Sequence, residues 1–297
     1  MKQASFCAAL AAAICIAMVP SQSWAARYWT GNKDSNWATS GNWTSTSGRR
    51  YFRKGNLTGE KRDFIYLSAN VTETSNTGLC FYDVPDRGYW RFQGQNQYTF
   101  DNSSPSNNKD YDQDSICIGY AGAGSSVRFY AVTLKTRHLT IGGNATLGKE
   151  IVKYDMTGHL VLDDLNNDAN GYGGPVNITA TKTCDFFKGD LYATNANITC
   201  QGDMMLYTFT VDKTGGDWTM TGDFKIGLGS GTATVIQRSG TFLVPAGKWT
   251  RFESGSTSTL NLYGGTFKTR RITNQSAASA SVILDGGSIE VNGDASN

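Results

Sequence analysis

Residues 260–267 are Leu-Asn-Leu-Tyr-Gly-Gly-Thr-Phe, and residues 282–289, 22 positions later, are Val-Ile-Leu-Asp-Gly-Gly-Ser-Ile. Each segment alternates apolar and polar side chains, turns at a Gly-Gly pair, and continues with a hydroxyl residue and a large apolar one. This pattern is typical of a β-strand, a tight turn and a second strand. A unit that recurs about every 20 residues predicts a solenoid, in which each coil buries its inward side chains against its neighbours.

The repeat continues towards the N-terminus with slightly different spacings. Residues 177–179 match 197–199 at an offset of 20, residues 202–203 match 222–223 at 20, and residues 240–242 match 265–267 at 25. Residues 138–141 also match 159–162 at an offset of 21, which places these two segments in consecutive coils. We therefore predict an all-β, right-handed parallel β-helix of about eight coils over residues 116–297.

The alternation within these segments predicts which side chains form the core. We expect the inward positions to be Leu139, Ile141, Leu160, Leu162, Ile178, Ile198, Leu260, Leu262, Val282 and Leu284. In particular, Leu139 should stack on Leu160 in the next coil, and Leu260 should stack on Val282. The intervening polar residues Thr140, Asn261 and Lys268 are expected to face outward.

The first 25 residues have the composition of an export signal. Lys2 supplies a positive start, residues 8–19 form an apolar run of twelve, and Ser23-Trp24-Ala25 resembles a cleavage site. Twelve apolar residues are fewer than the roughly 20 that span a bilayer. We therefore predict a Sec-type signal peptide over residues 1–25 and a mature chain that begins at Ala26, located at the cell surface, in the medium or in the periplasm.

Residues 26–115 differ from the rest because they are rich in aromatic side chains, including Trp29, Trp37, Trp43 and Trp90. The open end of a solenoid exposes an apolar cross-section and strand edges, which capping segments cover. We predict that this region is an N-terminal, β-rich cap. The alternative is that Trp29, Trp37 or Trp43 lies on the surface and stacks on sugar rings, as in a carbohydrate-binding module.

Charge and cysteine content limit the partners and cross-links that can be expected. The chain has 27 basic and 25 acidic residues and no basic block, so we expect no nucleic-acid partner. The mature chain has four cysteines, Cys80, Cys117, Cys184 and Cys200, which allow three pairings. Cys184 and Cys200 fall in consecutive coils and are the favoured bridge, whereas the alternative is that the cysteines are buried thiols.

One segment links the chain to a family. Residues 29–43, Trp-Thr-Gly-Asn-Lys-Asp-Ser-Asn-Trp-Ala-Thr-Ser-Gly-Asn-Trp, follow the signal peptide directly. They resemble the start of large secreted bacterial β-helix proteins with autotransporter-associated strand repeats, and the Gly-Gly units near residues 264 and 286 resemble those repeats. The resemblance implies a right-handed parallel β-helix that is exported to the cell surface as a passenger.

The sequence departs from that family at its C-terminal end. It stops at Asn297, close to a repeat unit, without a β-barrel translocator, a sorting signal or an obvious cap. We therefore expect either a missing C-terminal anchor or a partner that covers the last coil, including end-to-end self-association.

The sequence contains three groups of residues that could carry chemistry. His138 and His159 are the only histidines, and their matched positions suggest a metal or acid–base pair, although the repeat alone explains the match. Asp110, Asp112 and Asp114 alternate, and residues 164–170 space oxygen ligands as a calcium loop does, but Ala169 and Pro175 depart from the EF-hand pattern. The alternative is that the loop of residues 110–114 and the loop from Asp164 to Asn170 are solvated turns without a metal ion.

The third group is Asp203 and Asp223, which follow glycines at equivalent points of successive coils. Paired carboxylates are what a polysaccharide-cleaving β-helix needs, but we find no basic residue beside them at a repeated position. The sequence therefore assigns no catalytic, cofactor-binding or metal residue. It favours an exported, non-catalytic, adhesin-like or structural protein with an unknown surface or carbohydrate ligand. The alternatives are a polysaccharide-acting β-helix enzyme and a carbohydrate-binding module.

Overall fold

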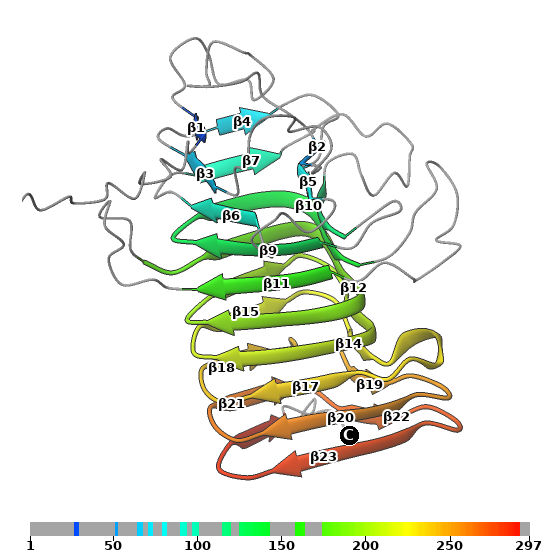
Figure 1. The fold of residues 1–297 in the computed structure, drawn as a ribbon. Coiled ribbons are helices and arrows are strands. Elements are labelled where there is room, and N and C mark those ends of the chain that lie inside the picture. The colour runs from blue at the N-terminus through cyan, green and yellow to red at the C-terminus, as the bar shows by residue number, and fades with distance from the viewer. Residues whose placement is uncertain are drawn as a thin grey trace, which may run out of the picture.

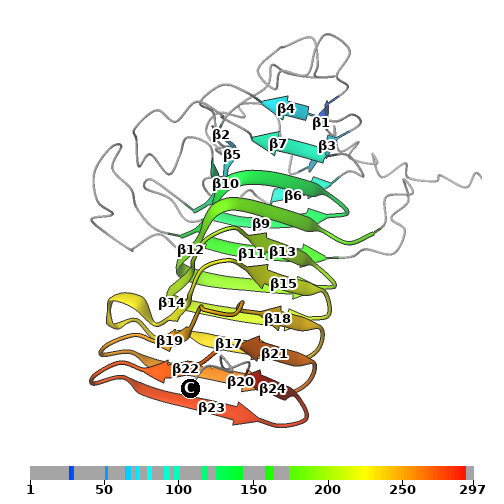
Figure 2. The same cartoon turned by 180° about the vertical axis from the view of Figure 1, so that it is seen from behind.

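The protein is a parallel β-solenoid. The computed structural model describes residues 27–29, 51–52, 64–67, 71–73, 79–81, 90–93, 97–100, 115–119, 125–142, 158–163 and 174–291. Within these residues the chain is nearly all strand, and every strand pairing is parallel. Figures 1 and 2 show the strands stacked in layers along one axis, with the red C-terminal strands at one end. The all-β, parallel solenoid prediction is confirmed.

The strands form three faces, and each strand pairs in parallel with the next member of its face. The first face comprises β4 (Val71–Glu73), β7 (Gln97–Phe100), the start of β10 (Thr133–Ile141), the start of β12 (Asn177–Thr194), β13 (Asn197–Cys200), β15 (Asp217–Met220), β18 (Thr241–Leu243), β21 (Thr266–Thr269) and β24 (Ser288–Val291). The second face comprises β2 (Tyr51–Phe52), β5 (Leu79–Phe81), β8 (Ser115–Ile118), the end of β10, the middle of β12, the start of β14 (Met204–Thr214), β16 (Phe224–Ile226), β19 (Thr250–Phe252) and β22 (Ile272–Asn274).

The third face completes each coil before the chain returns to the first face. It comprises β1 (Arg27–Trp29), β3 (Phe64–Leu67), β6 (Trp90–Gln93), β9 (Ser125–Tyr130), β11 (Gly158–Asp163), the end of β12, the end of β14, β17 (Thr234–Gln237), β20 (Thr257–Leu262) and β23 (Ser279–Leu284). A short 3-10 turn, Leu228–Ser230, lies between β16 and β17.

Coil length varies more than the sequence repeat suggests. Successive coils begin on the first face at register partners Thr133, Asn177, Asn197, Asp217, Thr241, Thr266 and Ser288, which bound six coils. Eight coils were predicted over residues 116–297, and the number is smaller because the coil that begins at Thr133 extends over 44 residues to Asn177.

Parallel pairing also begins earlier than the repeat that could be traced in the sequence. The strands described before residue 115 pair with one another and then with β8, β9 and β10. The stack therefore continues into residues 26–115. The side chains of Trp29, Trp37, Trp43 and Trp90 lie outside the described residues, so the aromatic cap stays a prediction, as does the signal peptide over residues 1–25.

Most of the predicted core is confirmed. The inward residues Leu139, Ile141, Leu160, Leu162, Ile178, Ile198, Leu260 and Leu262 are at most 1% exposed. Leu260 pairs with Val282 as predicted, but Val282 and Leu284 are 40% and 55% exposed because they belong to the last described coil. Thr140, which was expected to face outward, alternates in β10 with the inward Leu139 and Ile141 but is itself buried, so its position on the outward side does not expose it to solvent.

The predicted stacking of Leu139 on Leu160 is also wrong. Leu139 pairs with Cys184 on the second face, whereas Leu160 pairs with Leu191 on the third face. Residues 138–141 and 159–162 are thus consecutive faces of one coil rather than equivalent strands of two coils. The apolar alternation is the same on every face, so an offset of 21 residues does not reveal which face a segment occupies.

An aromatic ladder fills the interior of the later coils. Trp218 pairs with Phe242, which pairs with Phe267, and the ring centroids of Phe242 and Phe267 are 5.1 Å apart. Phe224 joins from the second face, 4.7 Å from the Phe242 ring. The Trp218 indole N–H donates a 3.1 Å hydrogen bond to the Ala196 carbonyl, so the one polar atom of this ladder is satisfied.

Candidate functional site

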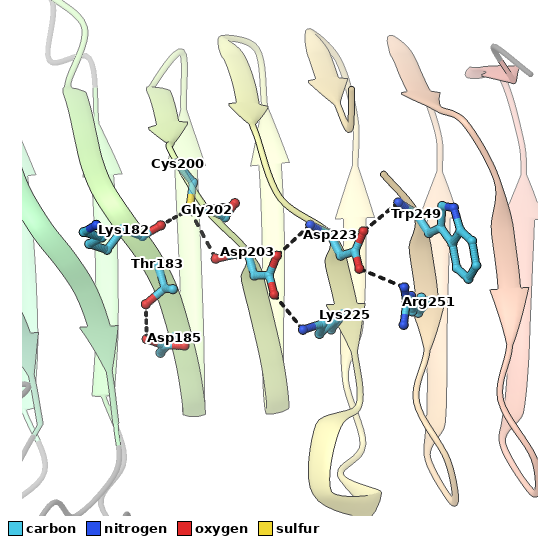
Figure 3. A network of polar contacts seen from close by, with 10 residues as sticks. All are labelled: Lys182, Thr183, Asp185, Cys200, Gly202, Asp203, Asp223, Lys225, Trp249 and Arg251. Atoms are coloured by element: carbon cyan, nitrogen blue, oxygen red, sulfur yellow. Dashed lines mark hydrogen bonds and ion pairs between the residues drawn. The ribbon is translucent and has the colours of Figure 1, made fainter. Parts of the chain in front are cut away.

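The structure brings Asp203 and Asp223 together in one array of charged residues on the second face (Figure 3). Each aspartate precedes a second-face strand, Asp203 before β14 and Asp223 before β16. One oxygen of Asp203 accepts a 2.8 Å hydrogen bond from the Asp223 backbone N–H, and the other contacts Lys225 Nζ at 2.6 Å. We name Asp203, Asp223, Lys225, Trp249 and Arg251 the aspartate ladder.

Asp223 makes the same kind of contacts to the next coil. One of its oxygens accepts a 2.9 Å hydrogen bond from the Trp249 backbone N–H, and the other lies 3.0 Å from an Arg251 guanidinium nitrogen. Lys225 and Arg251 are register partners in β16 and β19. The prediction that no basic residue accompanies the aspartates at a repeated position is therefore wrong. The basic residue is supplied one coil later and two positions on, which the inserted residues before Trp249 hide in the sequence.

The electrostatics of the ladder favour a charged Asp203. Partial burial by itself would raise the pKa of this carboxyl, but the hydrogen bonds from Lys225 and from the Asp223 N–H outweigh it and hold the pKa below its usual value. A general acid that cleaves a glycosidic bond needs a carboxyl with a raised pKa. Asp203 has the opposite shift, and each of its oxygens already has a protein partner.

The carboxyl with a raised pKa on this face is Asp185, and it is shielded from solvent. Its side chain is 1% exposed, and burial raises its pKa to about 7 against the effect of a hydrogen bond that the Thr183 hydroxyl donates to Oδ2. Among the described residues, Oδ1 of Asp185 and Oγ1 of its register partner Thr140 have no hydrogen-bond partner. Asp185 therefore holds a proton near neutral pH but cannot present it to a polysaccharide in solvent.

The two histidines are not a pair. His138 lies on the second face and pairs with Thr183, whereas His159 lies on the third face and pairs with Asp190, so the predicted equivalence is wrong. His138 Nδ1 is 2.8 Å from Thr183 Oγ1, and His159 Nδ1 is 2.7 Å from Asp190 Oδ2. Burial, followed by the charges of Arg137 and Lys182, lowers the pKa of His138 to about 4.

Because the Thr183 hydroxyl donates to Asp185, its oxygen accepts the hydrogen bond from His138 Nδ1, which fixes the tautomer of a neutral imidazole. Asp190, the carboxylate beside His159, is 31 residues away in the sequence and could not be recognised from it. Among the described residues, no group of three or more His, Cys, Asp or Glu side chains could hold a metal ion. The predicted calcium loops at Asp110, Asp112 and Asp114 and at Asp164 to Asn170 lie outside the described residues.

The favoured disulfide is not formed. Cys184 and Cys200 are both buried thiols, on the second and first faces, respectively. The two thiols hydrogen-bond each other, which raises the pKa of Cys184 and lowers that of Cys200, and the Cys200 sulfur also contacts the Asp203 carbonyl oxygen at 3.2 Å (Figure 3). Cys117 is buried in β8 and is the register partner of Cys80 in β5.

A buried lysine, for which the sequence gives no signal, binds the backbone carbonyls of a turn between two strands. Lys213 is 1% exposed, and its ammonium donates hydrogen bonds of 2.8–2.9 Å to the carbonyl oxygens of Gly215, Gly216 and Ser239. Burial lowers its pKa to about 8. In the next coil the register partner of Lys213 is Gln237, whose side-chain amide donates to the Gly240 and Thr266 carbonyls. Both side chains satisfy turn carbonyls that would otherwise be buried without donors.

Trp249 at the end of the ladder is held by two arginines. The guanidinium carbons of Arg251 and Arg271 lie 4.4 and 4.7 Å from its ring centroid. Such cation–π contacts contribute about 0.5–1 kcal/mol each at exposed sites. The ring therefore links consecutive coils, since Arg271 precedes β22 in the coil after that of Trp249.

Comparison of the chain with protein-family models, with curated proteins and with solved structures found no match. Within the described part of the chain, no helix has the length and apolar character that crossing a membrane requires.

Proposed function

We propose that this chain is an exported, non-catalytic β-solenoid that acts at the cell surface or in the extracellular medium, with an adhesive or structural role. The observation that carries the proposal is the engagement of the ladder carboxylates. Every carboxylate oxygen of Asp203 and Asp223 contacts the next coil, through a backbone N–H or through Lys225 and Arg251. These contacts hold consecutive coils together, as expected of side chains that stabilise a rigid, elongated scaffold.

Export is supported by the sequence of residues 1–25 and by the resemblance of residues 29–43 to secreted β-helix passengers. The whole chain and a version without residues 1–25 should be expressed in a bacterium and fractionated. The proposal expects export of the whole chain only, with Ala26 as the new N-terminus by mass spectrometry. Retention of the whole chain in the cytoplasm would contradict it.

The non-catalytic part of the proposal requires a separate test. Purified residues 26–297 should be incubated with neutral and acidic polysaccharides, and the release of reducing ends and the binding to a glycan array should both be measured. We expect no release of reducing ends. Asp203→Asn should lower the melting temperature, whereas Asp212→Asn, which removes a pairing with the exposed guanidinium of Arg238 and no hydrogen bond to the backbone of the next coil, should lower it less.

A second candidate is a polysaccharide-acting enzyme, favoured by the gathering of Asp203, Asp223, Lys225 and Arg251 on one face. Basic side chains next to paired carboxylates are what an anionic polysaccharide would require. Cleavage of a polysaccharide by the wild type, lost in Asp203→Asn at an unchanged melting temperature, would establish this candidate and overturn the first. The carbohydrate-binding alternative depends on Trp29, Trp37 and Trp43. Replacing each of them with Ala and measuring binding to the same glycan array tests it.

A further inference from the structure

Arg271 presents a guanidinium group that is held in place but has no anionic partner. Its guanidinium carbon lies 4.7 Å from the ring centroid of Trp249, and its backbone carbonyl accepts a 2.9 Å hydrogen bond from the Thr250 N–H. The residue is exposed, and among the described residues no carboxylate lies within ion-pair distance of it. Stacking on an aromatic ring leaves the planar N–H donors of an arginine available to a ligand. Arg271 is therefore preorganised to bind an anion that the described part of the chain does not supply.

Arg251 places a second guanidinium group on the same ring, with its carbon 4.4 Å from the centroid. One terminal nitrogen of Arg251 lies 3.0 Å from an oxygen of Asp223, and the side chain is 30% exposed. The Trp249 backbone N–H donates a 2.9 Å hydrogen bond to the other oxygen of Asp223, and the Trp249 carbonyl accepts one of 2.9 Å from the Phe224 N–H. The ring that holds both guanidinium groups is thus itself fixed to the preceding coil.

The end of the aspartate ladder carries an excess of positive charge. Each ladder carboxylate is already neutralised by a basic residue of the ladder. Lys248 and Arg271 add two positive charges, and both side chains are exposed and without an ion-pair partner in the part of the chain that the structure describes. Lys248 interacts electrostatically with Asp203, so it lies close to the ladder. Glu253 and Arg270, which lie between Lys248 and Arg271 in the sequence, offset each other, so that two net positive charges remain.

These basic groups follow the long axis of the solenoid. Lys225 and Arg251 are register partners in β16 and β19, and such partners lie about 4.8 Å apart in a sheet. In Figure 3, Arg251 and the Trp249 ring lie one coil beyond Lys225. Arg271 precedes β22 in the coil after that. A linear ligand that lies along the axis would therefore meet a basic side chain at each of three successive coils.

A linear polymer that carries carboxylates at regular intervals fits this arrangement. Guanidinium groups bind carboxylates through two parallel hydrogen bonds, which adds orientation to the attraction between charges. Nucleic acid fits less well, because single strands are bound by aromatic rings on which bases stack, and the Trp249 ring is already in contact with two guanidinium groups. The net charge of +2 for the whole chain is also low for a nucleic-acid-binding protein.

We propose that Arg271 and Lys248, with the remaining N–H donors of Lys225 and Arg251, bind the carboxylate groups of an acidic polysaccharide that lies along the solenoid. The polysaccharide is held and not cleaved, because the ladder carboxylates are engaged with the next coil. The choice of a polysaccharide rests on the exported, adhesive role proposed above, whereas the anion site rests on the geometry alone. Purified protein tests the site whether or not the chain is exported, so the two proposals can fail separately.

The test measures the binding of purified residues 26–297 to immobilised polygalacturonate by surface plasmon resonance. We expect binding that weakens as the salt concentration rises, and none to the fully methyl-esterified polymer, which keeps the sugar chain but lacks its charges. Arg271→Gln should weaken binding by about tenfold or more, the usual effect of losing a charge-assisted hydrogen bond. Arg238→Gln is the matched control, because it removes another exposed arginine that contacts an aromatic ring, Tyr263, and it should leave the affinity nearly unchanged.

Two further variants separate geometry from charge and test the second basic group. Arg271→Lys keeps the positive charge but lacks the planar pair of donors, so it should recover only part of the affinity lost in Arg271→Gln. Lys248→Gln should weaken binding as well, and all variants should melt close to the wild-type temperature because both side chains are exposed. No binding of the wild type at low salt, or equal losses in Arg271→Gln and Arg238→Gln, would overturn the proposal. Tighter binding to a single-stranded DNA oligonucleotide than to polygalacturonate would also overturn it.

Discussion

Replacing Asp185 with Asn should remove a loss of stability that the protein undergoes as the pH rises from 5 to 7. Burial raises the pKa of this carboxyl to about 7 in the folded chain, whereas an aspartate in an unfolded chain titrates near 3.8. The folded state therefore binds the proton more tightly. Its contribution to stability is complete below about pH 4 and is lost as the pH rises towards 7.

The size of the effect follows from the separation of the two pKa values. Within the window each pH unit corresponds to about 1.4 kcal/mol, so the free energy of unfolding of the wild type should fall by about 2–3 kcal/mol between pH 5 and pH 7 through this group alone. An Asn amide placed where Oδ1 now has no partner costs roughly 1–3 kcal/mol, but this cost does not vary with pH. The difference between variant and wild type, followed against pH, isolates the titration.

The measurement is urea unfolding at pH 5, 6 and 7, followed by tryptophan fluorescence, for the wild type, Asp185→Asn and Asp212→Asn. The free-energy difference between Asp185→Asn and wild type should rise by about 2–3 kcal/mol in favour of the variant across this range. Asp212→Asn, which removes a carboxylate that is paired with Arg238, is the control for the loss of one negative charge. If the Asp185→Asn and wild-type profiles are parallel, Asp185 is ionised in the folded chain and the argument fails.

Three further predictions concern packing and turns, each measured as a free energy of unfolding in urea. Leu262→Ala should destabilise the protein by about 2–5 kcal/mol because the side chain is fully buried, whereas Leu284→Ala, at a 55% exposed side chain, should cost less than about 1 kcal/mol; equal losses would contradict the exposure of Leu284. Lys213→Met should destabilise the protein by about 2–3 kcal/mol because it leaves turn carbonyls without a hydrogen-bond donor. Lys213→Gln should recover part of this loss, since Gln237 donates to turn carbonyls in the next coil. An unchanged stability of Lys213→Met would show that these hydrogen bonds do not stabilise the turn. Gly189→Ala should cost at least about 2 kcal/mol, because φ is +131° and the new Cβ would collide with the Gly158 carbonyl; a stable variant would show that β11 and β12 lie further apart than described.

The sequence was sufficient for the fold class because the solenoid depends on local alternation. Apolar residues at every second position, interrupted by Gly-Gly turns, predict short strands that can only be buried by stacking. Where two units also had equal loop lengths, the register was predicted correctly, as for Ile178 with Ile198 and Leu260 with Val282. The shared position of Asp203 and Asp223 in successive coils was recognised for the same reason.

The contacts of the aspartate ladder could not be predicted because they join residues from different coils. Lys225 reaches Asp203 across 22 positions, and Asp190 reaches His159 across 31. These separations include turns of variable length, so no fixed spacing marks them. The burial of Asp185 was also hidden, since an aspartate on the outward side of a strand gives no sign in the sequence of what will cover it.

The sequence by itself therefore determined that strands form, that they stack in parallel, and which alternate side chains are apolar enough to fill the core. The tertiary structure alone decided which of three faces each segment occupies. The physical reason is that a strand on any face shows the same two-residue alternation, while the face is set by where the chain turns its corners. The misplaced pairing of Leu139 with Leu160 and the separation of His138 from His159 follow from that choice, whereas the supply of Lys225 and Arg251 to the aspartates follows from the register between coils on one face.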